Sequence, residues 1–228
     1  MKKVGFIGGY NKIDMLLYVA KMLTIAEKKV LLVDTTKEQT AKYVVPAINP
    51  TVSYITNYEN IDVAIGFNNL REIKEYLSEE LDYDFILVDI DNIQAFINYE
   101  MDNSFKNYFV TSFNVYSIKK GLEIIKELAN PIELTKVIFA KQILDEENNY
   151  LDFLSLGYKV KWNDYRVYFP LEMGDESAII DNQRLSRIKF SNLTSQYKES
   201  LMYITEELIG EKEVNNFIKN LRNFEKGE

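Results

Sequence analysis

The sequence predicts an α/β fold, a doubly wound and mostly parallel sheet flanked by helices in a three-layer α/β/α arrangement. Short apolar runs alternate with helical patterns along the whole chain, which is the order of elements in such folds. Two of the runs, 30–34 and 85–89, end in an aspartate, and a glycine pair separates the first run from the first helix. Ligands of doubly wound sheets bind at the carboxyl ends of the strands, so these features also predict where the site lies.

The expected elements follow one another without a repeat or a linker. We expect strands at about 3–7, 30–34, 85–89, 107–111, 135–140 and 165–169. We expect helices at about 13–26, 69–81, 116–129, 146–156, 175–185 and 195–209. Segment 35–50 is expected to be a loop, and Asn163-Asp164 a hairpin turn. Residues 1–210 then form a single domain, and 211–228 form a C-terminal amphipathic helix or tail.

Composition excludes several classes of function. The chain has no Cys and no His, so disulfides, thiol nucleophiles, imidazole chemistry, zinc and haem are not expected. A net charge of −8 does not favour nucleic acid as a partner, because nonspecific binding to DNA requires a positive field. We see no signal peptide and no apolar run of about 20 residues, so we expect a cytoplasmic protein.

The turn between the first strand and the first helix has the composition of an anion site. Gly8-Gly9 lets the backbone turn tightly after the strand, and this aims the free N–H groups of the following helix at whatever lies above them. Those donors, the helix dipole and Lys12 together would suit a phosphate group.

Two segments carry a resemblance to a known family. The run Phe6–Asp14, followed by Lys28–Asp34, resembles the start of the ParA/MinD-type P-loop ATPases of the SIMIBI class. The deviant Walker A motif of that family reads Gly-Lys-Gly-Gly-Val-Gly-Lys-Thr-Thr, and its second strand ends in Asp. The order of elements matches this family over nearly the whole chain, which implies a P-loop NTPase-like fold.

The resemblance implies a nucleotide site at the carboxyl edge of the sheet. Its candidate residues are Gly8, Gly9, Tyr10, Asn11, Lys12, Asp34 and Asp89. Asp89 corresponds to the Walker B aspartate, which holds magnesium through water, and it is the one candidate for a metal ligand. We assign no catalytic residue.

The same alignment shows what the motif has lost. Asn11 replaces the glycine before the lysine, Ile13 replaces the hydroxyl residue that binds magnesium, and Ile7 replaces the signature lysine. Thr36 replaces a second acidic residue, and 140–142 lack the Asn that reads the base. The resemblance therefore implies a site that binds ATP or ADP weakly or not at all. In the opposing interpretation the glycines only form a tight turn, Lys12 is solvated, and Asp89 caps the next helix.

Three functions remain open from the sequence. The first, which we favour, is a non-hydrolysing positioning or assembly module that acts through a protein partner and forms a homodimer or works alone. The second is an active ATPase in partitioning or in assembly of cell-surface machinery, with Lys12, Asp34 and Asp89 as its minimal set. The third is a membrane-surface adaptor, peripheral at the inner face of the membrane.

The third function rests on the tail, 211–228. Its apolar residues fall on one helical face: Val214, Phe217, Ile218, Leu221 and Phe224. MinD proteins end in an amphipathic membrane-targeting helix, so by position the tail resembles one. Its acidic and basic residues balance, however, which reduces attraction to anionic lipid. The alternative is a terminal helix that packs on the domain or on a partner.

Overall fold

The computed structural model describes residues 1–47, 51–142 and 145–227. In this part of the chain eight strands form one sheet in the order β3-β4-β2-β5-β1-β6-β7-β8. The strands are β1 (Lys2–Ile7), β2 (Val30–Asp34), β3 (Tyr54–Tyr58), β4 (Ile61–Ile65), β5 (Phe85–Ile90), β6 (Lys106–Ser112), β7 (Ile132–Ala140) and β8 (Val160–Pro170). Only β3 is antiparallel to its neighbour, which confirms the predicted mostly parallel sheet.

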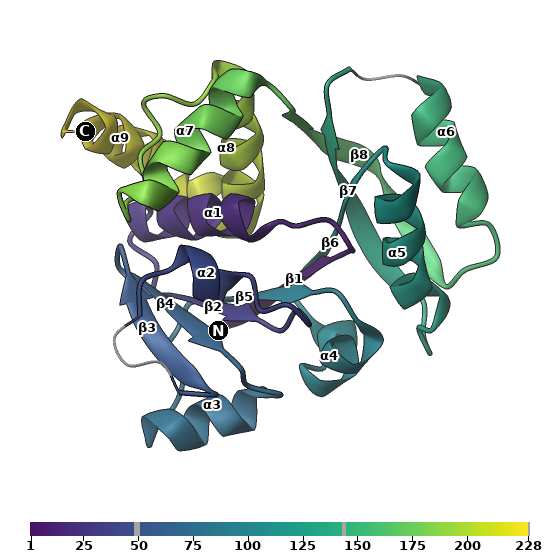
Figure 1. Cartoon of the computed structure of the whole chain (residues 1–228), viewed down its shortest axis with the longest axis horizontal. Coiled ribbons are helices and arrows are strands. Elements are labelled where there is room, and N and C mark those ends of the chain that lie inside the picture. Colours follow the sequence, from purple (N-terminus) through teal and green to yellow (C-terminus); the bar gives the residue numbers. More distant parts are fainter. Residues whose placement is uncertain (48–50, 143–144, 228) are drawn as a thin grey trace.

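Helices cover both faces of the sheet and complete the three layers (Figure 1). They are α1 (Ile13–Ile25), α2 (Ala41–Val44), α3 (Leu70–Leu77), α4 (Ile93–Asn98), α5 (Val115–Lys126), α6 (Asp145–Leu154), α7 (Met173–Arg184), α8 (Ser195–Ile209) and α9 (Glu211–Gly227), with a short 3₁₀ turn at Met101–Asn103. One core cluster joins α1, α8 and α9 to one face, and a second joins α3, α4 and α5 to the other. All six predicted strands are present. Five of them, β1, β2, β5, β6 and β7, are buried over most of their length, and parallel strands buried on both faces read as continuous apolar runs. The sixth, β8, lies at the edge of the sheet and has an alternating pattern.

The first helix is enclosed by the last part of the chain. In Figure 1, α1 lies beneath α7 and α8, with α9 at its far end. Long-range hydrogen bonds tie these helices together. Asn182 Nδ2 donates to the Tyr18 hydroxyl (2.7 Å), Gln183 Nε2 to Asp14 Oδ1 (2.7 Å) and Asn220 Nδ2 to the Ile25 carbonyl (3.2 Å). The layer around α1 is therefore built from both ends of the sequence.

The sheet contains a hairpin, β3–β4, that the predicted elements omit. Its two turn residues, Glu59 and Asn60, both have positive φ angles, 55° and 67°. Such a turn normally contains glycine. Here Lys21 Nζ on α1 contacts both the Glu59 carbonyl (3.1 Å) and its carboxylate (2.7 Å), so a tertiary contact holds the turn.

The predicted hairpin turn at Asn163-Asp164 is wrong. The segment runs through as one strand, β8, and its register against β7 shifts between Leu134 and Lys136, which pair with Trp162 and Arg166. Two extra residues on β8 are accommodated as a bulge, which interrupts the ladder without reversing the chain.

Other differences from the predictions lie at α3 and α2. Helix α3 ends at Leu77 rather than at 81, because Ser78 takes a left-handed conformation (φ 57°) that terminates it. The short helix α2 lies within the segment predicted to be loop, and residues 48–50 of that segment lie outside the described residues.

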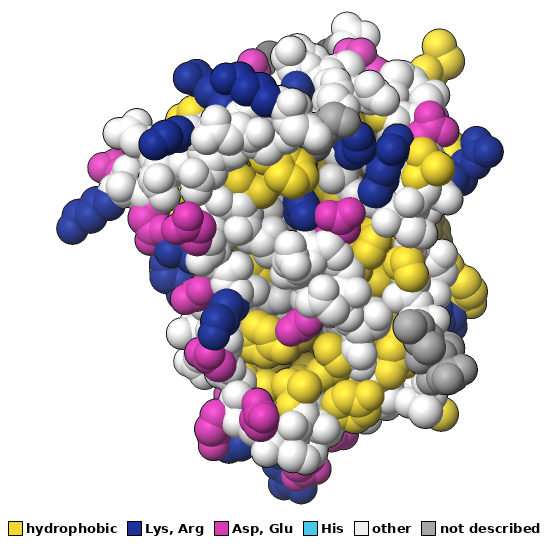
Figure 2. Space-filling model, turned by 90° about the vertical axis from the view of Figure 1, so that its left-hand side faces the viewer, with side chains coloured by type: hydrophobic (Ala, Val, Ile, Leu, Met, Phe, Trp, Pro, Cys, Tyr) yellow, Lys and Arg dark blue, Asp and Glu magenta, His cyan; other side chains and the backbone are white. Residues whose placement is uncertain are grey.

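The tail forms α9, which packs with its apolar side against the domain. Phe217 is 1% exposed and Leu221 is 5% exposed, and the Phe224 ring lies against Phe190 with its centroid 6.0 Å away. At the other end of the same side of the molecule, apolar side chains gather over the part that carries β3 and α3 (Figure 2). None of the described helices is long and apolar enough to span a bilayer.

Candidate functional site

The candidate residues meet where β1, β2 and β5 end, side by side, at the carboxyl edge of the sheet. Phe6 pairs with Asp89, Asp34 also pairs with Asp89, and the Gly8 N–H donates to the Ile90 carbonyl (2.9 Å). Asp89 therefore lies close to the glycine turn, at the edge of the sheet where the site was predicted. The crossover from β1 through α1 to β2 places β5 between the two strands, so their three ends converge.

The glycines fit the turn closely against β6 and α5. Gly8 has a φ of +152°, and a Cβ there would lie 2.0 Å from the Val110 carbonyl oxygen. A Cβ on Gly9 would lie 2.6 Å from Cγ of Lys120. A side chain at either position would collide with β6 or α5, so the close packing of the turn requires both glycines whether or not a ligand binds there.

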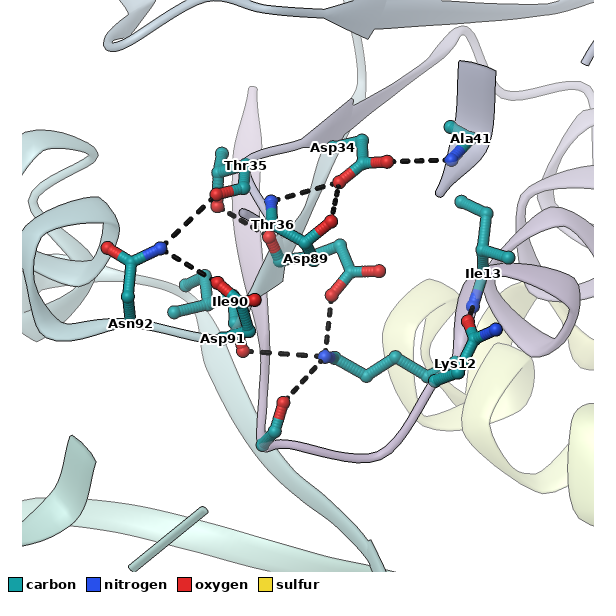
Figure 3. A network of polar contacts seen from close by, with 12 residues as sticks. Lys12, Ile13, Asp34, Thr35, Thr36, Ala41, Asp89, Ile90, Asp91 and Asn92 are labelled. Carbon is teal, nitrogen blue, oxygen red and sulfur yellow. Dashed lines mark hydrogen bonds and ion pairs between the residues drawn. The ribbon is translucent and has the colours of Figure 1, made fainter. Parts of the chain in front are cut away.

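Lys12 is buried and paired with Asp89 (Figure 3). Its ammonium lies 2.6 Å from Asp89 Oδ1 and donates to the carbonyls of Gly8 (3.0 Å) and Ile90 (3.4 Å). Both side chains are 1% exposed, so the interpretation of Lys12 as a solvated residue is wrong. Nor does Asp89 cap the next helix, since the Asn92 side chain caps α4 by accepting from the Ala95 N–H (2.9 Å).

Electrostatics around Asp89 are unfavourable apart from this lysine. Burial raises the pKa of the Asp89 carboxyl to about 6, and the negative charges of Asp34 and Asp91 raise it as well, while Lys12 lowers it. A carboxylate in such surroundings requires a cation beside it, and Lys12 is that cation.

Both oxygens of the Asp34 carboxylate accept hydrogen bonds from residues that follow β2. Its Oδ1 accepts from the Thr36 N–H (2.9 Å) and hydroxyl (2.6 Å), and its Oδ2 accepts from the Ala41 N–H (2.7 Å). Asp34 is 1% exposed. It therefore shapes the segment between β2 and α2, as Figure 3 shows.

The other motif positions make contacts of their own. Ile7 and Ile13 are each 1% exposed and belong to the two apolar cores. Asn11 Oδ1 accepts from the Ile13 N–H (3.3 Å), which is one of the free donors at the start of α1. Tyr10 stacks on Phe139 at the end of β7, with ring centroids 4.6 Å apart.

The structure adds one residue that the sequence interpretation missed. Asp14, in the first turn of α1, contributes to a cavity of about 460 Å³ between the glycine turn, the ends of β7 and β8, and α7. Tyr10, Asn11 and Lys141 also line this cavity. An acidic residue in the first turn of a helix is a common stabilising feature, so the sequence alone did not mark Asp14 as part of a site.

A mostly parallel sheet of this strand order, with a glycine turn and a lysine after β1 and an aspartate next to the last residue of the neighbouring β5, matches the fold of P-loop ATPases of the ParA/MinD type. MinD from Aquifex aeolicus, in its complex with MinC, is similar over 92% of this chain and 96% of its own, with a TM-score of 0.60 and 15% identity. A putative plasmid partition protein from Borrelia burgdorferi bound to AMPPNP is similar over 95% and 98%, with a TM-score of 0.57 and 12% identity.

McdA from Cyanothece, an Asp→Ala variant in complex with ATP, is similar over 92% of this chain and 96% of its own, with a TM-score of 0.58 and 11% identity. No protein-family model matches the sequence, and no curated protein matches it. At such low sequence identities, the similarity to these structures establishes the fold alone.

Proposed function

We propose that this chain is a ParA/MinD-type protein that does not hydrolyse ATP and works as a positioning or assembly module. The observation that carries the proposal is the buried ion pair of Lys12 with Asp89. In an active P-loop the lysine contacts the phosphates and the aspartate orients magnesium. Here each group neutralises the other.

The ion pair makes nucleotide binding costly. Breaking a buried pair costs about 3–5 kcal/mol, which corresponds to a loss of at least about a hundredfold in affinity before new phosphate contacts offset it. The acidic surroundings of Asp89 and the carboxylate of Asp14 add repulsion toward a triphosphate.

Magnesium does not fit the residues present at this edge. Ile13 occupies the position of the hydroxyl ligand, is 1% exposed and has no oxygen to offer. Among the described residues no group of three acidic side chains is arranged to hold a metal ion. Since metal-bridged phosphate oxygens carry much of the developing charge in phosphoryl transfer, we derive no catalytic step for this chain.

The proposal includes a protein partner. The similar MinD structure is a complex with MinC, so the fold is able to present a docking surface for another protein. We include a homodimer in the proposal, and light scattering of the purified chain with and without Mg-ATP tests whether dimers form and whether nucleotide controls them.

The experiment that tests the proposal compares the wild type with Lys12→Ala and with Lys37→Ala, which removes an exposed lysine from a nearby loop. We expect steady-state ATP turnover at background level in all three proteins and no rise of the unfolding midpoint with Mg-ATP. Turnover in the wild type that Lys12→Ala abolishes and Lys37→Ala preserves would show the proposal to be wrong.

A nucleotide-binding ATPase is the second candidate, because MinD from Pyrococcus horikoshii was solved with Mg-ADP and the partition protein with AMPPNP. In that case wild type is stabilised by ATP, and Ile13→Thr makes the stabilisation dependent on magnesium by restoring a hydroxyl ligand. Measurement of bound nucleotide in freshly purified protein gives an independent answer.

Membrane association through residues 211–228 is also a proposal, and the packing of α9 sets its cost. Phe217 and Leu221 are buried against the domain, so a bilayer would have to compete with this contact. Flotation with liposomes of the full chain and of a chain ending at Gly210 tests it, and equal flotation of both would exclude an anchor in the tail.

A further inference from the structure

The cavity beside the glycine turn has the dimensions and lining of a small-molecule site. Its volume of about 460 Å³ falls within the usual range for such sites, about 300–1,000 Å³. Tyr10, Phe139 and Tyr197 supply aromatic walls, and Met15 and Ile179 supply aliphatic ones. Tyr10 is held in place by its stacking on Phe139, so the walls are pre-formed.

A carboxylate without a cation faces this cavity. Asp14 is half-buried, and Gln183 Nε2 donates to its Oδ1 (2.7 Å). Among the described residues no Lys or Arg forms an ion pair with Asp14, although Lys141 lines the cavity. Burial is the larger influence on Asp14 and raises the pKa of its carboxyl, which the Gln183 hydrogen bond lowers. A half-buried carboxylate of this kind is stabilised by a cation that reaches it.

Further negative charge lies around the same space. Glu172 and Glu176 line the cavity and are exposed, and Asp175 lines it but is bonded to the Thr194 N–H and hydroxyl. Tyr10, Asp14 and Glu176 all line this cavity, and the charges of the two acidic groups, after burial, raise the pKa of the Tyr10 hydroxyl. The local field therefore favours a positive ligand and disfavours a phosphate.

We propose that this cavity binds an organic cation, an ammonium or guanidinium group joined to an apolar or aromatic part, with Asp14 as its counter-ion. The cationic group pairs with the free oxygen of Asp14, and the apolar part packs between Tyr10 and Tyr197, whose ring faces also attract cations. The cation comes either from a free amine or from a Lys or Arg side chain of a partner. This proposal concerns a ligand and does not depend on whether ATP is hydrolysed.

The test titrates the full chain with 2-phenylethylammonium and with 2-phenylethanol, a neutral molecule of the same shape, and follows binding by NMR. A tripeptide, N-acetyl-Leu-Arg-Leu-amide, represents the side chain of a partner. We expect the two cationic probes to bind and the alcohol to bind at least about tenfold more weakly, since a charge-assisted hydrogen bond is lost. Whichever cationic probe binds more tightly identifies the source.

Variants locate the site. Asp14→Asn keeps the shape and the acceptor for Gln183, and we expect it to weaken cation binding at least about tenfold. Glu79→Gln, which removes an exposed charge from the segment between α3 and β5, is the matched control and should change affinity less than about twofold. Glu176→Gln, at an exposed position, should give an intermediate loss and does not depend on the fold tolerating a change in α1.

Equal affinity for the alcohol and the ammonium, or unchanged binding in Asp14→Asn, would overturn the proposal. No binding of either cationic probe at millimolar concentration would overturn it as well. Because none of these measurements involves ATP, their failure is distinguishable from the detection of ATP turnover, which would contradict the proposed function.

Discussion

Replacing Lys12 alone is predicted to destabilise the protein strongly. In Lys12→Met the side chain keeps a similar volume, but Asp89 remains 1% exposed without its cation. At a separation of 2.6 Å the attraction lost is about 6 kcal/mol in an effective dielectric of about 20. Removing the buried ammonium recovers part of this as relief of its desolvation. We therefore expect the free energy of unfolding to fall by about 3–5 kcal/mol at pH 8.

The loss should depend on pH, with a sign set by Asp89. Its folded-state pKa is raised from 3.8 to about 6, so its protonated form favours folding below about pH 4 and this contribution is lost as the pH rises through 6. Lys12 is the strongest influence that lowers this pKa, so in Lys12→Met the pKa is higher still. Between pH 6 and pH 8 the variant should lose up to about 1.4 kcal/mol per pH unit relative to the wild type.

Urea unfolding at pH 6, 7 and 8 measures this effect. Adding Asp89→Asn to Lys12→Met removes the unpaired charge and should bring stability back to within about 2 kcal/mol of the wild type, without the pH dependence. Lys37→Met, a change at an exposed lysine, is the control. If Lys12→Met costs no more than Lys37→Met, or if its cost is the same at all three pH values, the reasoning about the buried pair is refuted.

Three further predictions concern stability. Gly8→Ala should cost about 2–3 kcal/mol in urea unfolding, because its Cβ would lie 2.0 Å from the Val110 carbonyl oxygen at a strained φ; a cost below about 1 kcal/mol would contradict the packing of the turn. Asp34→Ala should cost about 2–4 kcal/mol through three lost hydrogen bonds, and hydrogen exchange should show the segment after β2 opening first. A chain ending at Gly210 should melt several degrees lower than the full chain, because it uncovers the surface beneath Phe217; equal melting would mean that α9 does not support the domain.

The sequence was sufficient for the strands that are buried on both faces, and it failed where tertiary contacts decide. Strands β1, β2, β5 and β7 are apolar runs that end at recognisable positions, so their places along the chain follow from the local sequence pattern. The β3–β4 hairpin was missed because its turn, Glu59-Asn60, lacks glycine and is held by Lys21 from a distant helix. No local pattern reports that contact.

Part of the candidate site was likewise predictable from the sequence, and part of it required the fold. Alignment with the P-loop motif identified Lys12 and Asp89, and parallel pairing of β1 with β5 explains why they meet. The direction in which Lys12 points was not predictable, because a lysine after a glycine turn reaches either outward to an anion or inward to a carboxylate. Asp14 required the fold, since only the packing of α7 against α1 shows that its carboxylate lies in a cavity.

The enclosure of α1 by α7, α8 and α9 has a consequence for synthesis on the ribosome. Residues such as Met22 and Leu23 on α1 are 0% exposed in the finished protein, and Met22 is contacted by the hydroxyl of Thr205. These covering helices follow α1 and all the strands along the chain, so the apolar surface of α1 stays uncovered until the ribosome has made them. Domains whose core depends on contacts between segments far apart in the sequence fold slowly, and they are prone to aggregate while they are incomplete. This chain is therefore expected to need chaperone protection during translation, and a ribosome stalled before α8 should carry a nascent chain that is readily degraded by protease.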